Sequence, residues 1–172
     1  QTIQDGTPPA GILYGAEYKK EQINAALLSE NPFGVVPSRD TNGHGTFLAG
    51  VACGSESENG DFIGAAPQSE IIMVKLKEAK QYLREFFFVK DGVPAYQEND
   101  IMLAVSYLNG VANILNRPIV ICIALGNSAG SHASEGFLPS YLNYICGRRK
   151  RAVVAAAGNE ANARHHFQGR II

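Results

Sequence analysis

Two short segments of this chain carry the residue types that acyl-transfer chemistry needs. Residues 42–50 place His44 between two glycines at the start of an apolar stretch of small residues. That pattern predicts an uncrowded imidazole at a helix start, which suits a general base. Residues 153–160 place Asn159 directly after an apolar run, where its side-chain amide is able to donate a hydrogen bond to an oxyanion. The two segments therefore supply a base and an oxyanion donor, but neither a nucleophile nor a group that orients the base.

Small residues surround the expected position of Asn159. Ala156, Ala157 and Gly158 precede it and leave room for a ligand to approach the backbone. Leu125-Gly126 follows another apolar run, and backbone exposed there is able to pair with an extended peptide. Plainer interpretations remain open, because Gly-Asn is common in turns and Leu125-Gly126 also suits an ordinary strand end.

Asp40 lies four residues before His44 and admits two roles. Its carboxylate could orient the imidazole. A carboxylate just before a helix more often caps the first N–H groups of that helix. The sequence alone leaves both roles open.

Hydrophobic periodicity predicts the elements that position these residues. Apolar residues at three- and four-residue spacing, or runs of small apolar residues, predict helices at 17–28, 46–53, 99–116 and 138–146. Continuous apolar runs predict strands buried on both faces at 71–76, 119–124 and 153–157. Strands that alternate with helices favour an α/β fold with a parallel sheet, whose carboxyl-terminal strand ends share one edge. Residues 77–97 are expected to form a long excursion or a small hairpin.

Composition bounds the remaining possibilities. The chain has 172 residues, of which 45% are hydrophobic and 18% charged, so it is long enough and apolar enough for a globular core. A net charge of −1 argues against nucleic-acid binding, and the short basic run 148–151 is expected to be a solvated helix end. Three cysteines give no complete disulfide framework and are expected to be buried free thiols. No stretch is long and apolar enough to predict a membrane span.

Cofactor sites are not predicted. His132, His165 and His166 lack the spacing of a zinc site, and no acidic cluster indicates a calcium site. A dinucleotide-binding α/β domain would need a Gly-x-Gly-x-x-Gly turn after its first strand, and none is present. We therefore expect neither a cofactor nor a metal.

Four segments, in the right order, together resemble the subtilisin-like serine proteases (subtilases, peptidase family S8). They are the histidine motif, the segment that follows it, the substrate-binding strand end and the oxyanion-asparagine motif, at residues 43–50, 64–76, 124–126 and 155–160. The resemblance implies a three-layer α/β/α fold with a parallel sheet. It also implies peptide-bond hydrolysis by an Asp-His-Ser mechanism, with His44 as base and Asn159 as oxyanion donor. Leu125-Gly126 and Ala156-Ala157-Gly158 would form opposite walls of the pocket for the substrate residue before the scissile bond.

The chain also departs from the family pattern. The family's order is aspartate, histidine, serine. Asp5-Gly6 follows no strand, and no Gly-Thr-Ser-x-Ala motif follows Asn159; Ser128 and Ser131 lack that setting. Residues 1–172 are accordingly expected to be the central part of a catalytic domain, lacking its Asp-bearing and Ser-bearing segments.

Several expectations follow from this interpretation. The isolated piece should be inactive and prone to self-association through exposed strand edges, while the intact parent takes a protein or peptide substrate. The alternative function is a pseudoprotease, a binding module on the same fold. Some segments look closest to a clostridial branch that includes the spore-germination subtilases. A secreted or spore-associated bacterial protein would suit that branch, although the sequence does not establish the compartment.

Overall fold

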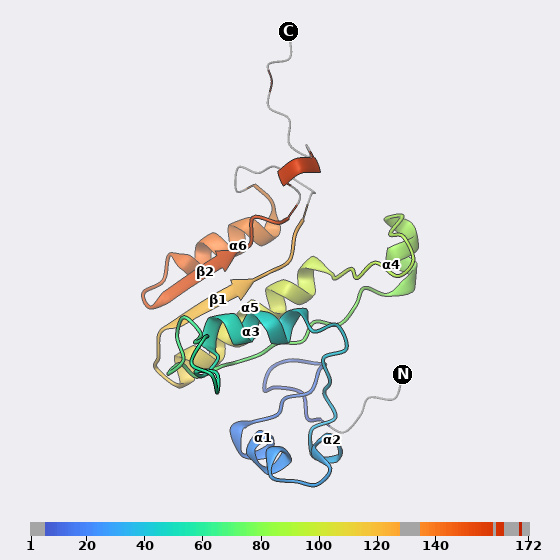
Figure 1. Ribbon diagram of the computed structural model, residues 1–172. Coiled ribbons are helices and arrows are strands. Elements are labelled where there is room, and N and C mark those ends of the chain that lie inside the picture. Colours follow the sequence, from blue (N-terminus) through green and yellow to red (C-terminus); the bar gives the residue numbers. More distant parts are fainter. Residues whose placement is uncertain (1–5, 128–134, 160, 164–168, 170–172) are drawn as a thin grey trace. The chain divides into compact units, whose positions relative to one another are not determined.

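A computed structural model of the protein describes residues 6–127, 135–159, 161–163 and 169 (Figure 1). Contacts between Cα atoms divide the chain into two compact units, Gln1–Met73 and Val74–Ile172. The first unit contains helices α1 to α3, and the second contains helices α4 to α6, strands β1 and β2 and a short 3₁₀ helix, η1 (Ala161–Ala163).

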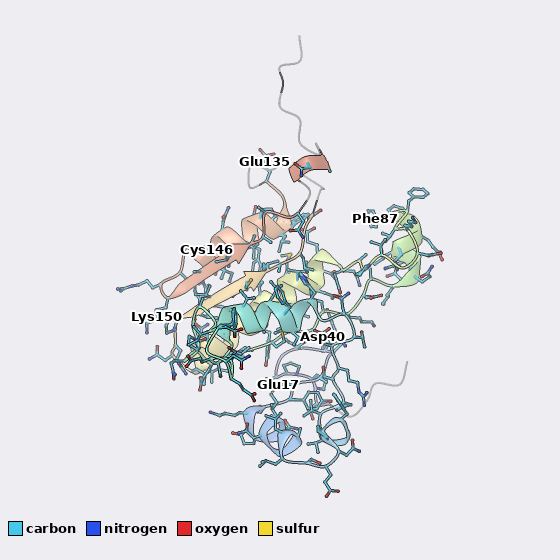
Figure 2. The ribbon with its side chains drawn as sticks, viewed as in Figure 1. Glu17, Asp40, Phe87, Glu135, Cys146 and Lys150 are labelled. Atoms are coloured by element: carbon cyan, nitrogen blue, oxygen red, sulfur yellow. The ribbon has the colours of Figure 1, made fainter. Side chains whose placement is uncertain are left out.

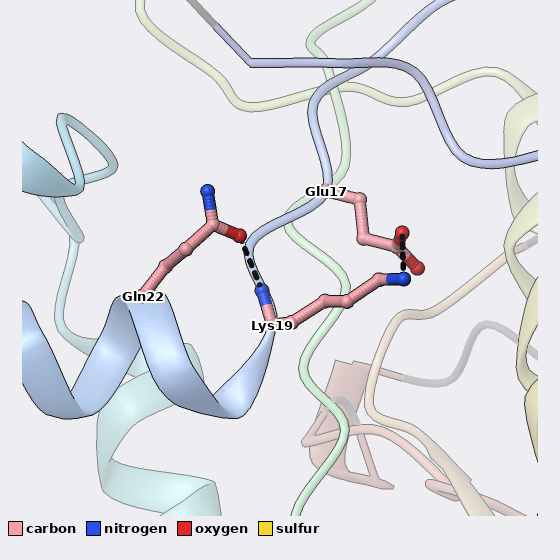
Figure 3. A network of polar contacts seen from close by, with 3 residues as sticks. All are labelled: Glu17, Lys19 and Gln22. Atoms are coloured by element: carbon pink, nitrogen blue, oxygen red, sulfur yellow. Dashed lines mark hydrogen bonds and ion pairs between the residues drawn. The ribbon is translucent and has the colours of Figure 1, made fainter.

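The first unit begins its regular structure at α1 (Lys20–Leu27), three residues later than the sequence predicts. Glu17 is not helical because its N–H donates to the Thr7 carbonyl at 3.0 Å in an antiparallel bridge. The Lys19 N–H donates to Oε1 of Gln22 at 2.9 Å, which satisfies one of the donors at the helix start (Figure 3). The Lys19–Glu17 ion pair at 3.9 Å contributes little, because the lysine is largely exposed.

Helix α2 (Pro32–Val35) follows after a short turn, and the contacts that begin it come from neighbouring residues. Asn31 accepts a hydrogen bond from the Gly34 N–H at 3.2 Å, and Pro32 stands where a missing N–H costs nothing. Helix α3 (His44–Cys53) ends the helical part of this unit. None of the α3 side chains is buried and Phe47 is mostly exposed, although a short run of small apolar residues suits a helix buried against a sheet.

The second unit carries the only sheet among the described residues. Strands β1 (Ile119–Ile123) and β2 (Arg151–Ala155) pair in parallel, with Ile119 opposite Arg151 and Ile123 opposite Ala155. The two arrows lie side by side in Figure 1. Helix α6 (Phe137–Cys146) connects the two strands along the chain, and α5 (Glu98–Ile114) precedes β1. This parallel pair with its helices confirms the predicted α/β fold class.

One core lies between this sheet and its helices. It forms around Val105 of α5, Ile121 of β1 and Ile145 of α6, all of them buried. Leu108, Ile119, Ile123, Tyr141, Leu142 and Val153 pack against this centre. Both helices therefore cover the face of β1 that carries the odd-numbered residues.

The other face of the sheet corrects the prediction that both strands are buried on both sides. Val120 is 68% exposed and Val154 is 54% exposed. Exposure alternates along β1 with the period of two that a strand covered on one face shows. The apolar runs therefore predicted helices on both faces of the sheet, whereas the helices of this unit cover one face only.

The prediction of a strand at 71–76 is also wrong, because these residues form no strand in the structure. Ile71 and Met73 are more than half exposed, whereas Ile72, Val74 and Leu76 are half-buried. Burial thus alternates as it would in a strand, but a strand also requires a hydrogen-bonded neighbour, and none pairs with it among the described residues.

Residues 77–97, the predicted excursion, form a hairpin-like loop that contains one short helix. Glu78 and Tyr96 form an antiparallel bridge, and α4 (Gln81–Phe86) lies between them. The Arg84 guanidinium donates to the Val93 carbonyl at 2.8 Å and so holds the return of the chain. Phe86, Phe87 and Phe88 are exposed at the end of α4 (Phe87 is labelled in Figure 2).

The three cysteines are free, as predicted, but Cys122 and Cys146 are exposed and Cys53 is half-buried. The expectation of buried thiols is therefore wrong for two of them. Among the described residues, no helix combines the length and hydrophobicity that crossing a membrane requires.

Candidate functional site

The backbone of the loop before α3 places His44 at the first helical position. Gly43 precedes it as the N-cap with a left-handed φ of 84°, and its carbonyl accepts the first helical hydrogen bond from Phe47 at 2.9 Å. Because an L residue in this conformation is disfavoured by roughly 1–2 kcal/mol, a turn of this shape favours glycine. The His44 N–H donates to Oδ1 of Asn42 at 3.3 Å, and the histidine is exposed. The structure gives no comparable steric reason for Gly45.

Asp40 is the residue that fixes this loop (labelled in Figure 2). Its Oδ1 accepts the N–H groups of Asn42 and Gly43 at 3.0 and 2.8 Å. Its Oδ2 accepts the N–H of Thr46 at 3.1 Å and the Thr46 hydroxyl at 2.6 Å. Of the two roles that the sequence left open, the structure therefore shows the cap.

The same bonds lower the pKa of the Asp40 carboxyl well below the ordinary range of an aspartate. The Thr46 hydroxyl has the largest effect, and the backbone N–H groups of Gly43, Asn42 and Thr46 follow. Each of these donors favours the ionised form. The sequence predicts a role for Asp40 but not its contact with Thr46, for which the only signal is the six-residue spacing of an acid and a hydroxyl across a helix start.

The Asp40 cap gives the protein a specific acid sensitivity. Since the pKa is lower in the folded state, the cap stabilises the fold above the ordinary aspartate pKa of about 3.9 and loses that effect as pH falls toward the lowered value. We expect Asp40→Asn to lower the unfolding midpoint most at neutral pH, with the difference from the wild type shrinking below about pH 4. Thermal unfolding between pH 2 and 7 measures this, and Asp91→Asn, at an exposed aspartate, is the matched control. An equal midpoint difference at pH 2 and pH 7 would contradict the assignment.

The end of α3 is held by the next segment of the family-like sequence. The N–H groups of Gly64, Ala65 and Ala66 donate to the carbonyls of Gly54, Val51 and Ala52, at 3.0, 3.1 and 2.8 Å. A Cβ on Gly64 would lie 2.5 Å from the backbone nitrogen of Gly54, so glycine is required for this close approach. Residues 64–66 therefore satisfy carbonyls at the helix end that would otherwise lack partners.

In the second unit, the carboxyl ends of β1 and β2 form one edge. Ile123 is opposite Ala155, and the Ala156 N–H continues the ladder by donating to the Ile123 carbonyl at 3.0 Å. Leu125-Gly126 therefore follows one strand of a paired set and residues 156–158 follow the other. The structure brings these two predicted walls to the same edge of the sheet, as parallel pairing requires.

The end of β2 is open and contains only small residues before Asn159. Ala156, Ala157, Gly158 and Asn159 are all exposed. Gly158 has a left-handed φ of 86°, so the chain turns immediately before Asn159. After β1, Leu125 is half-buried and Gly126 is exposed. His44 belongs to the first unit and Asn159 to the second.

No metal-binding site is present in the described part of the chain. No group of three or more His, Cys, Asp or Glu side chains lies close enough together there to hold a metal ion. Ser128, Ser131, His132, His165 and His166 lie outside the described residues.

Comparison with known proteins identifies a family and a similar solved structure. The model of the subtilase family, Peptidase_S8, matches residues 29–170. The solved structure of the Clostridium perfringens CspB protease is 36% identical, with a TM-score of 0.73, over 85% of this chain and 29% of that one. A search of the curated proteins finds no match. The chain thus spans less than a third of the length of the CspB protease.

Proposed function

This chain belongs to the subtilase family, and from that premise we propose that residues 1–172 are the central part of a serine endopeptidase catalytic domain. The observation that supports this most strongly is that one family match, over residues 29–170, includes both the His44 helix and the Asn159 turn. Either motif alone would be a weak signal, because histidines at helix starts and Gly-Asn turns are common.

His44 acts in this proposal as the general base. It takes the proton from the nucleophilic serine and returns it to the leaving amine. Asp40 has a structural role in this proposal, because its oxygens accept hydrogen bonds from the loop and from Thr46 and so fix the start of the His44 helix. In this proposal the orienting aspartate and the nucleophilic serine belong to the Asp-bearing and Ser-bearing segments of the family pattern, whose motifs residues 1–172 lack.

Asn159 acts as the oxyanion donor, with its side-chain amide directed at the tetrahedral intermediate. Leu125-Gly126 and residues 156–158 accept an extended peptide between them at the carboxyl edge of β1 and β2. Their exposed backbone and small side chains suit strand-like pairing with a substrate. The substrate class is accordingly protein or peptide.

Comparison of the intact parent protein with the isolated residues 1–172 tests the proposal. We expect the parent to hydrolyse a peptide mixture and to lose this activity with a serine-directed reagent, because the triad is complete only in the parent. The isolated piece should be inactive. Reagent-sensitive hydrolysis by the pure piece would contradict the proposed division, and a folded parent without activity would point to a pseudoprotease.

Self-association of the isolated piece is a second expectation. Among the described residues β1 and β2 form a two-stranded sheet, so each strand has one unpaired edge, and Val120 and Val154 expose an apolar face. Exposed edges and apolar faces favour pairing between chains. Light scattering on the pure piece should show a mass that rises with concentration, while a constant monomer mass over a hundredfold range would contradict this expectation.

A further inference from the structure

A basic cavity of about 260 Å³ lies at the amino-terminal ends of β1 and β2, away from the edge assigned to the peptide. It lies between the end of α5 and the loop after α6, where Lys150 is labelled in Figure 2. The residues that line it are Ala112, Asn113, Asn116, Arg117, Arg149, Lys150 and Arg151. Four of these seven carry a positive charge, and no carboxylate is among them.

One side of the cavity is built by the end of α5. The N–H of Asn116 donates to the Asn113 carbonyl at 3.1 Å, and the N–H of Arg117 donates to the Ala112 carbonyl at 3.0 Å. With Asn116 at a left-handed φ of 51°, these bonds form a Schellman motif. The turn places Arg117 at the cavity, directly before Pro118 and β1.

The other side is built by the loop before β2, and Arg151 joins the two sides. Its Nε donates to Oδ1 of Asn109 at 2.7 Å, and its Nη2 donates to Oδ1 of Asn113. Its Nη1 donates to the Lys150 carbonyl at 3.0 Å. The Arg151 guanidinium therefore binds the residues that form the two sides of the cavity. Lys150 lies next to it in the chain, with a left-handed φ of 64°.

These bonds hold like charges close together. Four cationic side chains line this one cavity, and no carboxylate lines it. The negative end of the α5 dipole compensates part of the positive charge. A helix end supplies only about half an elementary charge, against four cationic side chains.

We propose that this cavity binds a compact oxyanion with two or more negative charges. Arginine binds phosphate and carboxylate oxygens with paired N–H groups, and lysine adds a point charge. A volume of about 260 Å³ suits an anion of the size of pyrophosphate or citrate. Nucleic acid is not favoured, because the cluster is small and the chain carries a net charge of −1.

The anion would stabilise the start of both strands. The Lys150 carbonyl accepts the Ile119 N–H at 3.0 Å, so the loop that carries Lys150 also begins the pairing of β1 with β2. Leu125 and Ala156 follow the carboxyl ends of the same strands. Occupation of the cavity should therefore raise the unfolding midpoint of this unit.

Calorimetric titration of the protein with pyrophosphate tests the inference, with citrate as a second probe and sodium chloride at matched ionic strength. Arg149→Gln and Lys150→Asn each remove one lining cation, and asparagine tolerates the left-handed backbone at position 150. Arg148→Gln is the matched control, because it removes the same charge from a neighbour that does not line the cavity.

We expect saturable binding of pyrophosphate that the double variant Arg149→Gln/Lys150→Asn weakens at least about tenfold, the loss of about two charge-assisted contacts. Arg148→Gln should change the affinity less than about twofold. Citrate that competes would indicate a site for oxyanions generally, and citrate that does not would indicate a phosphate site. The proposal is overturned if no saturable binding occurs, or if Arg148→Gln weakens binding as much as the lining variants do.

Discussion

Replacement of His44 by alanine in the intact parent should reduce kcat for peptide hydrolysis by a factor on the order of 10⁶, the size known for subtilisin, the type member of this family. Without the imidazole, no group takes the proton from the serine, and the residual rate comes from substrate binding and the oxyanion donor. Because His44 is exposed and Gly43 sets the backbone turn, the alanine should leave folding intact. Steady-state kinetics with a peptide substrate measures the loss.

The matched control is His166→Ala, which removes another imidazole from the chain and should leave kcat within about twofold. Thermal unfolding of each variant separates a catalytic effect from a loss of structure. If His44→Ala retained more than about one hundredth of the wild-type kcat while folded, His44 would not be the base.

Replacement of Asn159 by alanine should reduce kcat by about 10²–10³, with little change in KM, in a parent that still folds. This range is likewise the one known for the oxyanion asparagine of subtilisin. The amide donates to the oxygen only once that oxygen carries a developing charge, so its loss affects the transition state more than the bound substrate. Asn159→Asp should be at least as slow, because a carboxylate of the same size repels the oxyanion.

Asn162→Ala is the control for this prediction, since it removes an exposed amide three residues further along the same segment. It should leave kcat within about twofold. An Asn159→Ala variant that raised KM and left kcat unchanged would assign the residue to substrate binding.

The sequence predicts the elements of the second unit well. Helices α5 and α6 and strand β1 lie within two residues of their expected bounds, because their apolar residues face a single core. Parallel pairing of β1 and β2 follows from the alternation of strands and helices. These features depend on local periodicity and on chain order, which one sequence carries.

Features that depend on distant partners were less predictable. Strand β2 begins at Arg151, two residues earlier than expected, because Arg151 pairs with Ile119 of β1, and its guanidinium also donates to Asn109 and Asn113 of α5. Arg151 belongs to the basic run 148–151, which is expected from the sequence to be a solvated helix end. Residues 71–76 show the opposite case, since their apolar run predicts a strand, but no described residue pairs with them as a neighbouring strand.

In the candidate site, too, features with a local sequence signal were predicted and features that depend on distant contacts were not. His44 and Asn159 were identified from their glycine neighbours and from the family-like motifs around them. The cap formed by Asp40 and the support that residues 64–66 give to the end of α3 depend on three-dimensional contacts. Both Gly43 and Gly64 are explained by the structure, the first by its left-handed backbone and the second by its approach to Gly54.

Active-site labelling with a fluorophosphonate tests the central claim most directly, applied to the intact parent, its His44→Ala variant and the isolated residues 1–172. A serine becomes reactive toward this reagent only when a base activates it. We predict labelling of the parent alone, which would establish a serine hydrolase that depends on His44. Labelling of the His44→Ala variant at the wild-type rate, or no labelling of a folded parent, would contradict the account.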